Sequence, residues 1–263
     1  MFQRVITAIV ALAIFLPLLF IGGLPFELLV MVMGIITLLE LLRVVGQPLW
    51  RFETLVTVII MVLVILPSRV LTLFPNEINQ MILFYAGAMI LLFISVFVPD
   101  RVKFEQAGTL SLAALYVGRG YHFLIETRNY GLLPLLFVLV IIWGNDSFAY
   151  IVGRLIGKNK LAPEISPNKT IEGSIGGIVG AFILSSIILY FDNFFGISLL
   201  QNIILVTLIG IIGQLGDLVE SGIKRAYGVK DSGTILPGHG GLLDRFDNML
   251  IALPMFYFII SFF

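Results

Sequence analysis

Seven long, mainly apolar runs set the strongest limit on how this chain can fold. A membrane-spanning helix needs about 20 apolar residues, within a range of roughly 17–25. Two shorter apolar stretches, Thr54–Leu66 and Thr109–Gly118, add to the seven. We therefore expect an all-α, polytopic integral membrane protein with about nine transmembrane helices. The seven runs are Val5–Ile21, Phe26–Leu42, Ile78–Val98, Gly131–Val152, Gly173–Phe191, Ile197–Gly216 and Phe246–Phe263.

The composition agrees with this expectation and excludes several classes of protein. The mean hydropathy is +1.07. Hydrophobic residues make up 59% of the chain, against roughly 45–50% in soluble domains. The net charge of zero excludes a polybasic nucleic-acid binder. The absence of cysteine excludes a disulfide framework, a thiolate metal site and a cysteine nucleophile.

The basic residues decide between seven and nine spans, because loops rich in Lys and Arg stay in the cytoplasm. With nine spans and a cytoplasmic N-terminus, 13 of the 16 Lys and Arg residues fall on one side. If Thr109–Gly118 does not cross, the same 16 divide 7 against 9, which specifies no orientation. We therefore expect nine spans, with the Arg154–Glu172 and Asp217–Arg245 loops in the cytoplasm.

The charged residues divide the chain into two regions of different character. Residues 1–130 are mostly apolar spans with short links, which indicates a structural and dimerisation role. Residues 131–263 carry the polar loops and form the expected catalytic region. In the first region, we expect Glu40 and Arg43 to form an ion pair at a helix end. We expect His122 to have a structural role in a short non-cytoplasmic link.

The segment Gly216–Asp247 is dense in charge although it lies between two apolar runs. A helix continuing through Asp217–Ala226 would place Asp217, Glu220, Ser221 and Lys224 on one face. An ion-paired helix end that reaches interfacial water would give a similar face. The small Ser221 between acid and base favours a functional face, since ionisable residues at membrane level are usually functional.

A glycine-rich turn follows, and after it the last apolar run opens with acids. Pro237–Gly241 contains His239, Gly240 and Gly241, and Asp244, Asp247 and Asn248 share one face of the next helix start. Single acids there could simply complement the helix dipole. Together with the nearby Lys and Arg residues, the set suits a phosphate substrate with a hard cation such as Mg²⁺. One His and no Cys supply too few ligands for zinc.

A second polar group surrounds residues 145–173. Asp146 lies inside an apolar span beside Asn145, and an interhelical hydrogen bond from Asn145 would not explain it. Lys169 and Thr170, just before a glycine-rich helix start, are typical of a phosphate-binding turn. The Walker pattern GxxxxGK[ST] is absent.

These motifs resemble those of the phosphatidate cytidylyltransferases, also called CDP-diacylglycerol synthases. Ser221–Asp247 fits that family's Ser-x-x-Lys-Arg, Lys-Asp-x-Gly, Pro-x-His-Gly-Gly and Asp-Arg-x-Asp spacing. The segment SPNKTIEG at 166–173 is similar to the family's SPKKTWEG, from which Asn168 and Ile171 depart. The N-terminal half matches the family in its hydrophobic character.

The resemblance implies an activity, a location and partners. CTP and phosphatidate would give CDP-diacylglycerol and pyrophosphate, with Mg²⁺ required and a second cation, K⁺ or another divalent ion, left open. It also implies a homodimeric helical bundle, multi-pass in a bacterial inner (plasma) membrane, with its active site facing the cytoplasm.

Residues and resemblance together assign roles to the site. Asp217 and Asp244 would hold the cation, and Asp247 would be a further ligand or a partner for Arg245. The triphosphate and the lipid phosphate would bind Lys169, Lys224, Arg225, Arg245 and His239. The other expected substrate-binding residues are Asn145, Asp146, Ser166, Thr170, Ser221, Lys230, Gly240 and Gly241.

Two other functions stay open at this point. A CTP-dependent polyprenol kinase would share the membrane, the nucleotide and the metal, but it would transfer the γ-phosphoryl group. A secondary transporter would fit the number of spans and the buried Asp146. Transporters, however, tend to have repeated halves with helices broken near mid-membrane, whereas the charges here gather on one face.

Overall fold

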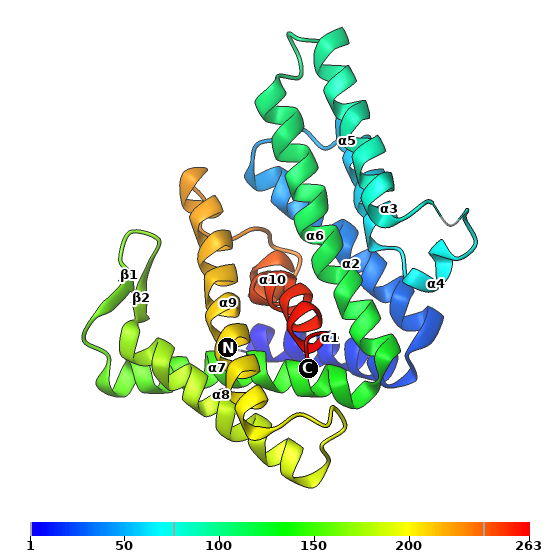
Figure 1. Cartoon of the computed structure of the whole chain (residues 1–263). Helices are drawn as coiled ribbons and strands as arrows, with labels where there is room; N and C mark the ends of the chain where they lie inside the picture. The colour runs from blue at the N-terminus through cyan, green and yellow to red at the C-terminus, as the bar shows by residue number, and fades with distance from the viewer. Residues whose placement is uncertain (1, 76, 239) are drawn as a thin grey trace. The chain divides into compact units, whose positions relative to one another are not determined.

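Helices form almost the whole structure, a computed structural model that describes residues 2–75, 77–238 and 240–263 (Figure 1). One two-stranded antiparallel sheet is the exception within these residues. The predicted all-α class is therefore confirmed. The elements are α1 (Phe2–Ile21), α2 (Gly23–Val44), α3 (Phe52–Ile65), α4 (Ser68–Leu71), α5 (Gln80–Phe97), α6 (Phe104–Tyr130), α7 (Leu132–Ile156), β1 (Lys160–Ala162), β2 (Ser166–Thr170), α8 (Ile171–Phe191), α9 (Leu199–Ala226) and α10 (Leu243–Ile260).

Five of the described helices, α2, α5, α7, α8 and α9, are long and apolar enough to cross a membrane. They support the prediction of a membrane protein, but the expected count of nine is not confirmed. Helices α1 and α3 are apolar but offer shorter apolar segments, Ile6–Ile21 and Phe52–Ile65. Helix α10 is apolar in its later turns but opens with Asp244, Arg245 and Asp247.

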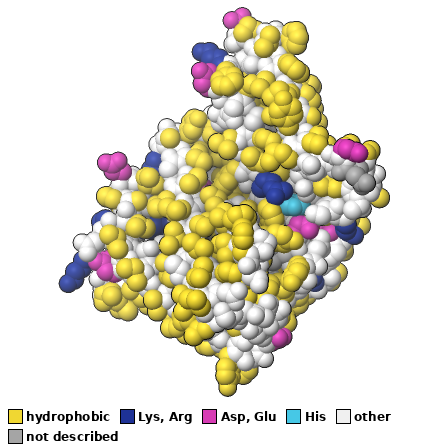
Figure 2. All heavy atoms as spheres, viewed as in Figure 1, with side chains coloured by type: hydrophobic (Ala, Val, Ile, Leu, Met, Phe, Trp, Pro, Cys, Tyr) yellow, Lys and Arg dark blue, Asp and Glu magenta, His cyan; other side chains and the backbone are white. Residues whose placement is uncertain are grey.

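Apolar side chains also cover much of the protein's outer surface. Figure 2 shows one face on which hydrophobic side chains predominate and charged ones are sparse. Helix α5 is an example, with Met81, Tyr85, Val96 and Phe97 all more than 60% exposed. Exposed apolar surface of this extent in a soluble protein would cause aggregation, whereas lipid accommodates it.

The chain divides into two compact units that each contain separate stretches of sequence. The first unit comprises residues 1–129 and 227–245, and the second comprises residues 130–226 and 246–263. The expected division into a structural region and a catalytic region stays a prediction. The glycine-rich turn groups with the N-terminal helices, although the sequence placed it in the C-terminal region.

The expected link around His122 is wrong, because helix α6 runs without interruption from Phe104 to Tyr130. His122 lies inside this helix and is only 3% exposed. Its Nδ1 is 3.0 Å from the Leu66 carbonyl oxygen. The low hydropathy of this stretch therefore reflects buried polar side chains of a helix and not a loop between helices.

In the first unit, Arg128 of α6 closes the C-terminal end of α1. Its guanidinium donates hydrogen bonds to the carbonyl oxygens of Leu19 and Phe20, at 2.6 and 2.9 Å. These are carbonyls that a helix end leaves without partners. Gly22 follows with φ of 69°, and a Cβ there would lie 2.6 Å from Arg128. Glycine thus permits both the turn and the cap.

In the second unit, glycines of α8 bring its backbone against α7. A Cβ added to Gly177 would lie 2.5 Å from the Asn145 carbonyl oxygen, and one added to Gly180 would overlap the Phe148 ring. Small residues at such spacings allow close helix approach in membranes, where packing rather than the hydrophobic effect drives association. This contact fixes the position of Asn145 and of the residues beside it.

We predict that Gly177→Ala lowers the free energy of unfolding by about 1–3 kcal/mol, since the backbone of α7 would have to move. Gly108→Ala is the matched control, because a Cβ there meets nothing within 4 Å. Alanine at that helical position should raise stability by up to about 1 kcal/mol. Thermal unfolding in detergent measures both; equal effects of the two substitutions would contradict the packing argument.

Candidate active site

The β1–β2 hairpin and the start of α8 position Lys169. In the register, Lys160 pairs with Thr170 and Ala162 with Ser166. The Thr170 side chain caps α8, accepting a hydrogen bond from the Gly173 N–H at 3.1 Å. Because Thr170 is buried and fixed in this way, the adjacent Lys169 projects from a defined turn.

Glu172 anchors the other side of the same hairpin. Its carboxylate accepts hydrogen bonds from the backbone N–H of Lys158 at 3.0 Å and of Asn159 at 3.2 Å. The Asn159 side-chain amide adds a further bond of 2.6 Å. Backbone N–H groups and the start of a helix both favour a carboxylate. This acid therefore holds the hairpin rather than facing a substrate.

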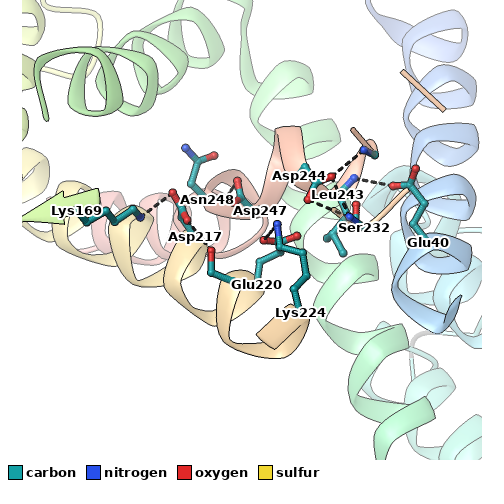
Figure 3. Close-up of polar contacts among 12 residues, drawn as sticks. Glu40, Lys169, Asp217, Glu220, Lys224, Ser232, Leu243, Asp244, Asp247 and Asn248 are labelled. Carbon is teal, nitrogen blue, oxygen red and sulfur yellow. Dashed lines mark hydrogen bonds and ion pairs between the residues drawn. The ribbon is translucent and has the colours of Figure 1, made fainter. Parts of the chain in front are cut away.

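Lys169 forms an ion pair with Asp217, which lies on α9. The distance between Lys169 Nζ and Asp217 Oδ2 is 2.6 Å, and both side chains remain partly exposed, at 25% and 34% (Figure 3). The Ser221 hydroxyl donates to the other oxygen of Asp217, at 3.3 Å. The structure thus brings together predicted site residues from two separate parts of the sequence, the end of β2 and α9.

Two more acids approach this pair from other helices of the second unit. Asp146 of α7 and Asp247 of α10 are both close enough for their charges to interact with that of Asp217 and of Lys169. The Asn248 side-chain amide donates to Asp146 at 2.5 Å. We call Asp146, Lys169, Asp217, Asp247 and Asn248 the acidic group.

Gly216 permits α9 and α10 to approach at this point. A Cβ on Gly216 would lie 3.1 Å from the Asp247 carbonyl oxygen and 3.2 Å from Asn248 Cα. Any side chain would therefore push the two helices apart beside the acids. The glycine that begins the charged segment thus has a packing role.

The predicted face of α9 divides into two separate pairs. Asp217 and Ser221 form the first, as described. Glu220 and Lys224 form the second, an ion pair of 2.7 Å in which the residues are only 1% and 9% exposed. A buried ion pair is costly to break, at about 3–5 kcal/mol when one partner is removed. Lys224 is consequently held in place by Glu220, which the sequence placed on the same helix face without a role of its own.

Asn145 lies in a buried polar network between α7, α8 and α9. Its Oδ1 accepts a hydrogen bond of 3.0 Å from Gln214, whose amide also donates to the Ser174 carbonyl oxygen at 3.2 Å. The Ser174 hydroxyl donates to the Gln214 Oε1. Asn145 is 2% exposed, so its side chain fixes three helices beneath the acidic group. Gln214 and Ser174 were missed because nothing in their spacing marks them.

In the first unit, Asp244 holds the glycine-rich turn. Its carboxylate accepts hydrogen bonds from the Gly241 N–H at 2.8 Å and from the Ser232 N–H at 3.1 and 3.2 Å. Gly240, with φ of 85°, supplies the backbone conformation that the turn needs and has no room for a Cβ beside Asp244. His239 lies outside the described residues.

Glu40 of α2 reaches the same turn, so the expected ion pair with Arg43 is wrong. Within the part of the chain that the structure describes, no ion pair joins these two side chains. Glu40 is 2% exposed, and its Oε2 accepts a hydrogen bond of 2.9 Å from the Leu243 N–H. The contact spans 203 residues of sequence, which no local pattern could reveal.

The other predicted site residues lie on the surface of their elements. Arg225, Lys230 and Arg245 are exposed, and Ser166 is half-buried at the start of β2. Their predicted contacts with substrate stay predictions.

Comparison with known proteins identifies the family to which the chain is similar. A model of the cytidylyltransferase family matches residues 2–263. The chain is 42% identical to a phosphatidate cytidylyltransferase of Bacillus subtilis, with 99% of this chain and 98% of that protein covered. It is 41% and 40% identical to proteins of the same name from Staphylococcus haemolyticus and Staphylococcus aureus, with 96% of each chain covered in both comparisons.

We predict that Thr170→Val lowers the free energy of unfolding by about 1 kcal/mol, because Gly173 loses its hydrogen-bond acceptor. Thr170→Ser keeps the acceptor and should retain most of the stability. Chemical or thermal unfolding of the two variants measures the difference. Equal stability of the valine and serine variants would show that the cap does not fix the hairpin.

Proposed function

Because the chain belongs to the cytidylyltransferase family, we propose that it transfers the cytidylyl group of CTP to phosphatidate. The products are CDP-diacylglycerol, a precursor in phospholipid synthesis, and pyrophosphate. The observation that carries this proposal is the 2.6 Å pair between Lys169 and Asp217 within the acidic group. It joins a phosphate-binding cation to an acid suited to a metal ion, beside apolar helices that place both near lipid.

The acidic group fits Mg²⁺ by the chemistry of its donors. Its oxygens are hard ligands from Asp146, Asp217, Asp247 and Asn248. Within the described residues, no three acidic or histidine side chains lie close enough to enclose a metal alone. Mg²⁺ rarely needs this, because one or two carboxylates usually hold it together with water and substrate phosphates. The Lys169 ammonium already neutralises Asp217, and this contact supports the proposal that positive charge is favoured here.

We assign Asp217 as the principal ligand and Asp146 and Asp247 as its neighbours in the same unit. The role of Asp244 as a second ligand stays a prediction, and so does any second cation. Asp244 gives two oxygens to backbone N–H donors, but each carboxylate oxygen has two lone pairs. When bound, Mg²⁺ would neutralise charge on the phosphate oxygens.

The basic residues of the site bind and orient the phosphates. Lys169 is a point charge that can exchange Asp217 for a phosphate oxygen. Lys224 adds positive charge from α9, and its pairing with Glu220 keeps it in one place. We propose that exposed Arg225 also contacts the phosphates, and the predicted substrate contacts of Lys230 and Arg245 stay predictions from the sequence.

The reaction needs positioning more than proton transfer. An oxygen of the phosphatidate phosphate forms a bond to the α-phosphorus of CTP, while the bond from that phosphorus to the bridging oxygen breaks and pyrophosphate leaves. A phosphate monoester is already a nucleophile near neutral pH, so no strong general base is required. Holding the two phosphates in line and neutralising their charge supply most of the rate.

The location and assembly follow as proposals from the charge distribution and the family. We propose a multi-pass protein of a bacterial inner membrane, with the acidic group on the cytoplasmic side where CTP is available. The excess of Lys and Arg in the loops near the site supports this orientation. We also propose a homodimer, which rests on the family resemblance.

We predict that Asp217→Asn lowers Mg²⁺-dependent formation of CDP-diacylglycerol by about 100-fold or more, a usual cost of losing one electrostatic contact to the transition state. Asp244→Asn tests the second predicted ligand in the same way. The assay uses folded protein in mixed micelles with CTP, phosphatidate and a Mg²⁺ titration.

Asp192→Asn is the matched control, because Asp192 is an exposed acid at the end of α8, away from the acidic group. Its turnover should equal that of the unaltered protein. Near-normal turnover of Asp217→Asn would remove this residue from the metal site, and a matching loss in Asp192→Asn would show a nonspecific effect.

A further inference from the structure

We propose that Glu40 is a positioning residue for the glycine-rich turn and thereby for Asp244. Glu40 belongs to α2, in the N-terminal half that the sequence analysis treated as structural. The inference deepens the proposed function and rests on it, because the turn it positions carries predicted substrate-binding residues.

The partners of Glu40 set it apart from the other buried glutamates of this half. Glu27 pairs with Arg69, and Glu53 pairs with Arg101 at 3.0 Å. In each pair, the arginine charge offsets the free-energy cost of burying the glutamate carboxylate. Among the residues that the structure describes, no Lys or Arg forms an ion pair with Glu40. Arg43 is close enough for its charge to act on Glu40, but the hydrogen bonds that Glu40 accepts come from backbone N–H groups, from Leu243 at 2.9 Å and from Leu242.

That hydrogen bond places a carboxylate at the N-terminus of α10. Leu243 is the first residue of this helix, and the first N–H groups of a helix have no partner within it. A negative charge there is favoured by the helix dipole. Residues of the local turn usually provide such a cap, whereas here a different helix provides it.

Two glycines bring backbone close to the Glu40 carboxylate, Gly233 before the glycine-rich turn and Gly241 at its end. A Cβ on Gly241 would lie 2.6 Å from Glu40 Oε2 and would overlap the Ser232 hydroxyl. A Cβ on Gly233 would overlap the other oxygen, Oε1. Both glycines are therefore needed for the backbone to approach Glu40. The signature glycine Gly241 is thus explained, at least in part, by a residue about 200 positions earlier.

Asp244 also binds the backbone of this segment, through its own carboxylate. It accepts hydrogen bonds from the N–H of Ser232, which precedes Gly233, and from the N–H of Gly241 itself (Figure 3). Glu40 fixes Leu243, and Leu243 is the residue before Asp244. Losing Glu40 would release the helix start, and the carboxylate of Asp244 would lose its orientation with it.

Two buried oxygens indicate that this arrangement is not optimised for stability. Glu40 Oε1 and Ser232 Oγ are buried and have no hydrogen-bond partner among the described residues. An unpartnered buried polar group lowers the stability of the folded state. A residue selected for packing alone would be apolar at this place. The cost is understandable if the carboxylate is retained to hold the turn.

Three substitutions of Glu40 distinguish the effect of its side-chain length from the effect of its negative charge. Glu40→Gln keeps the length and an acceptor oxygen for Leu243 but loses the charge. Glu40→Asp keeps the charge but is one methylene too short to reach. Glu40→Ala loses both. If Glu40 positions the turn, Glu40→Gln should retain more activity than Glu40→Asp. If the charge itself is needed, Glu40→Asp should retain more.

Two measurements are made on full-length protein in lipid nanodiscs. The first is kcat and KM for CTP, normalised to the folded fraction. The second is amide hydrogen exchange of residues 227–245, which does not depend on activity. We expect kcat/KM of Glu40→Ala to fall by roughly tenfold or more, since small displacements of a reacting group have effects of this size. Exchange at Ser232, Gly241 and Leu243 should accelerate, with α7 and α8 unchanged.

Glu53→Ala is the matched control, because it removes a buried glutamate of the same unit that pairs with arginines away from the turn. It should lower thermal stability but leave exchange in 227–245 and kcat/KM per folded molecule unchanged. If Glu40→Ala does not fold, the positioning role is tested on Glu40→Asp by the same measurements of kcat/KM and hydrogen exchange.

Unchanged exchange and activity in Glu40→Asp and Glu40→Ala would overturn the proposal, and so would equal effects of Glu53→Ala. If the unaltered protein makes no CDP-diacylglycerol, the proposed function fails, but the exchange experiment still decides whether Glu40 holds the turn.

Discussion

A carboxylate removed from water must find a cation or a set of N–H donors, and the polar parts of this apolar chain depend on that requirement. Burying an unpaired charge is too costly to persist. Asp217 therefore meets Lys169, Glu220 meets Lys224, and Asp244 receives backbone N–H groups. The contact between Lys169 and Asp217 joins elements that the sequence separates, so meeting the charge requirement also helps to assemble the site.

Glycine residues also help to assemble the site, because several of the acids contact backbone groups rather than side chains. Gly216 admits Asp247 close to α9, and Gly241 admits Glu40 and Ser232 to the turn. At Gly177 the same absence of a side chain lets α8 contact Asn145. At each of these three positions, a polar residue and a neighbouring backbone approach closely because glycine has no side chain. Their density in the motifs follows from packing as well as from binding.

Local patterns in the sequence predicted the elements well but not the contacts between them. The continuation of α9 through Asp217–Ala226 is confirmed, since helical spacing is a local property. The same spacing could have shown that Glu220 pairs with Lys224, four residues on. Glu40 could not be found in this way, because its partner is 203 residues away. The assignment of His122 to a link was wrong because polar residues inside a buried helix lower its mean hydropathy.

The central claim, that the acidic group serves transfer of a cytidylyl rather than a phosphoryl group, is tested most directly by following the phosphorus atoms of CTP. The protein is supplied with phosphatidate, Mg²⁺ and CTP labelled at either the α- or the γ-phosphorus. The account predicts that the α label enters the lipid and the γ label appears in pyrophosphate. The γ label in the lipid would indicate a kinase, and uptake of label into vesicles without turnover would indicate a transporter; either result would contradict the account.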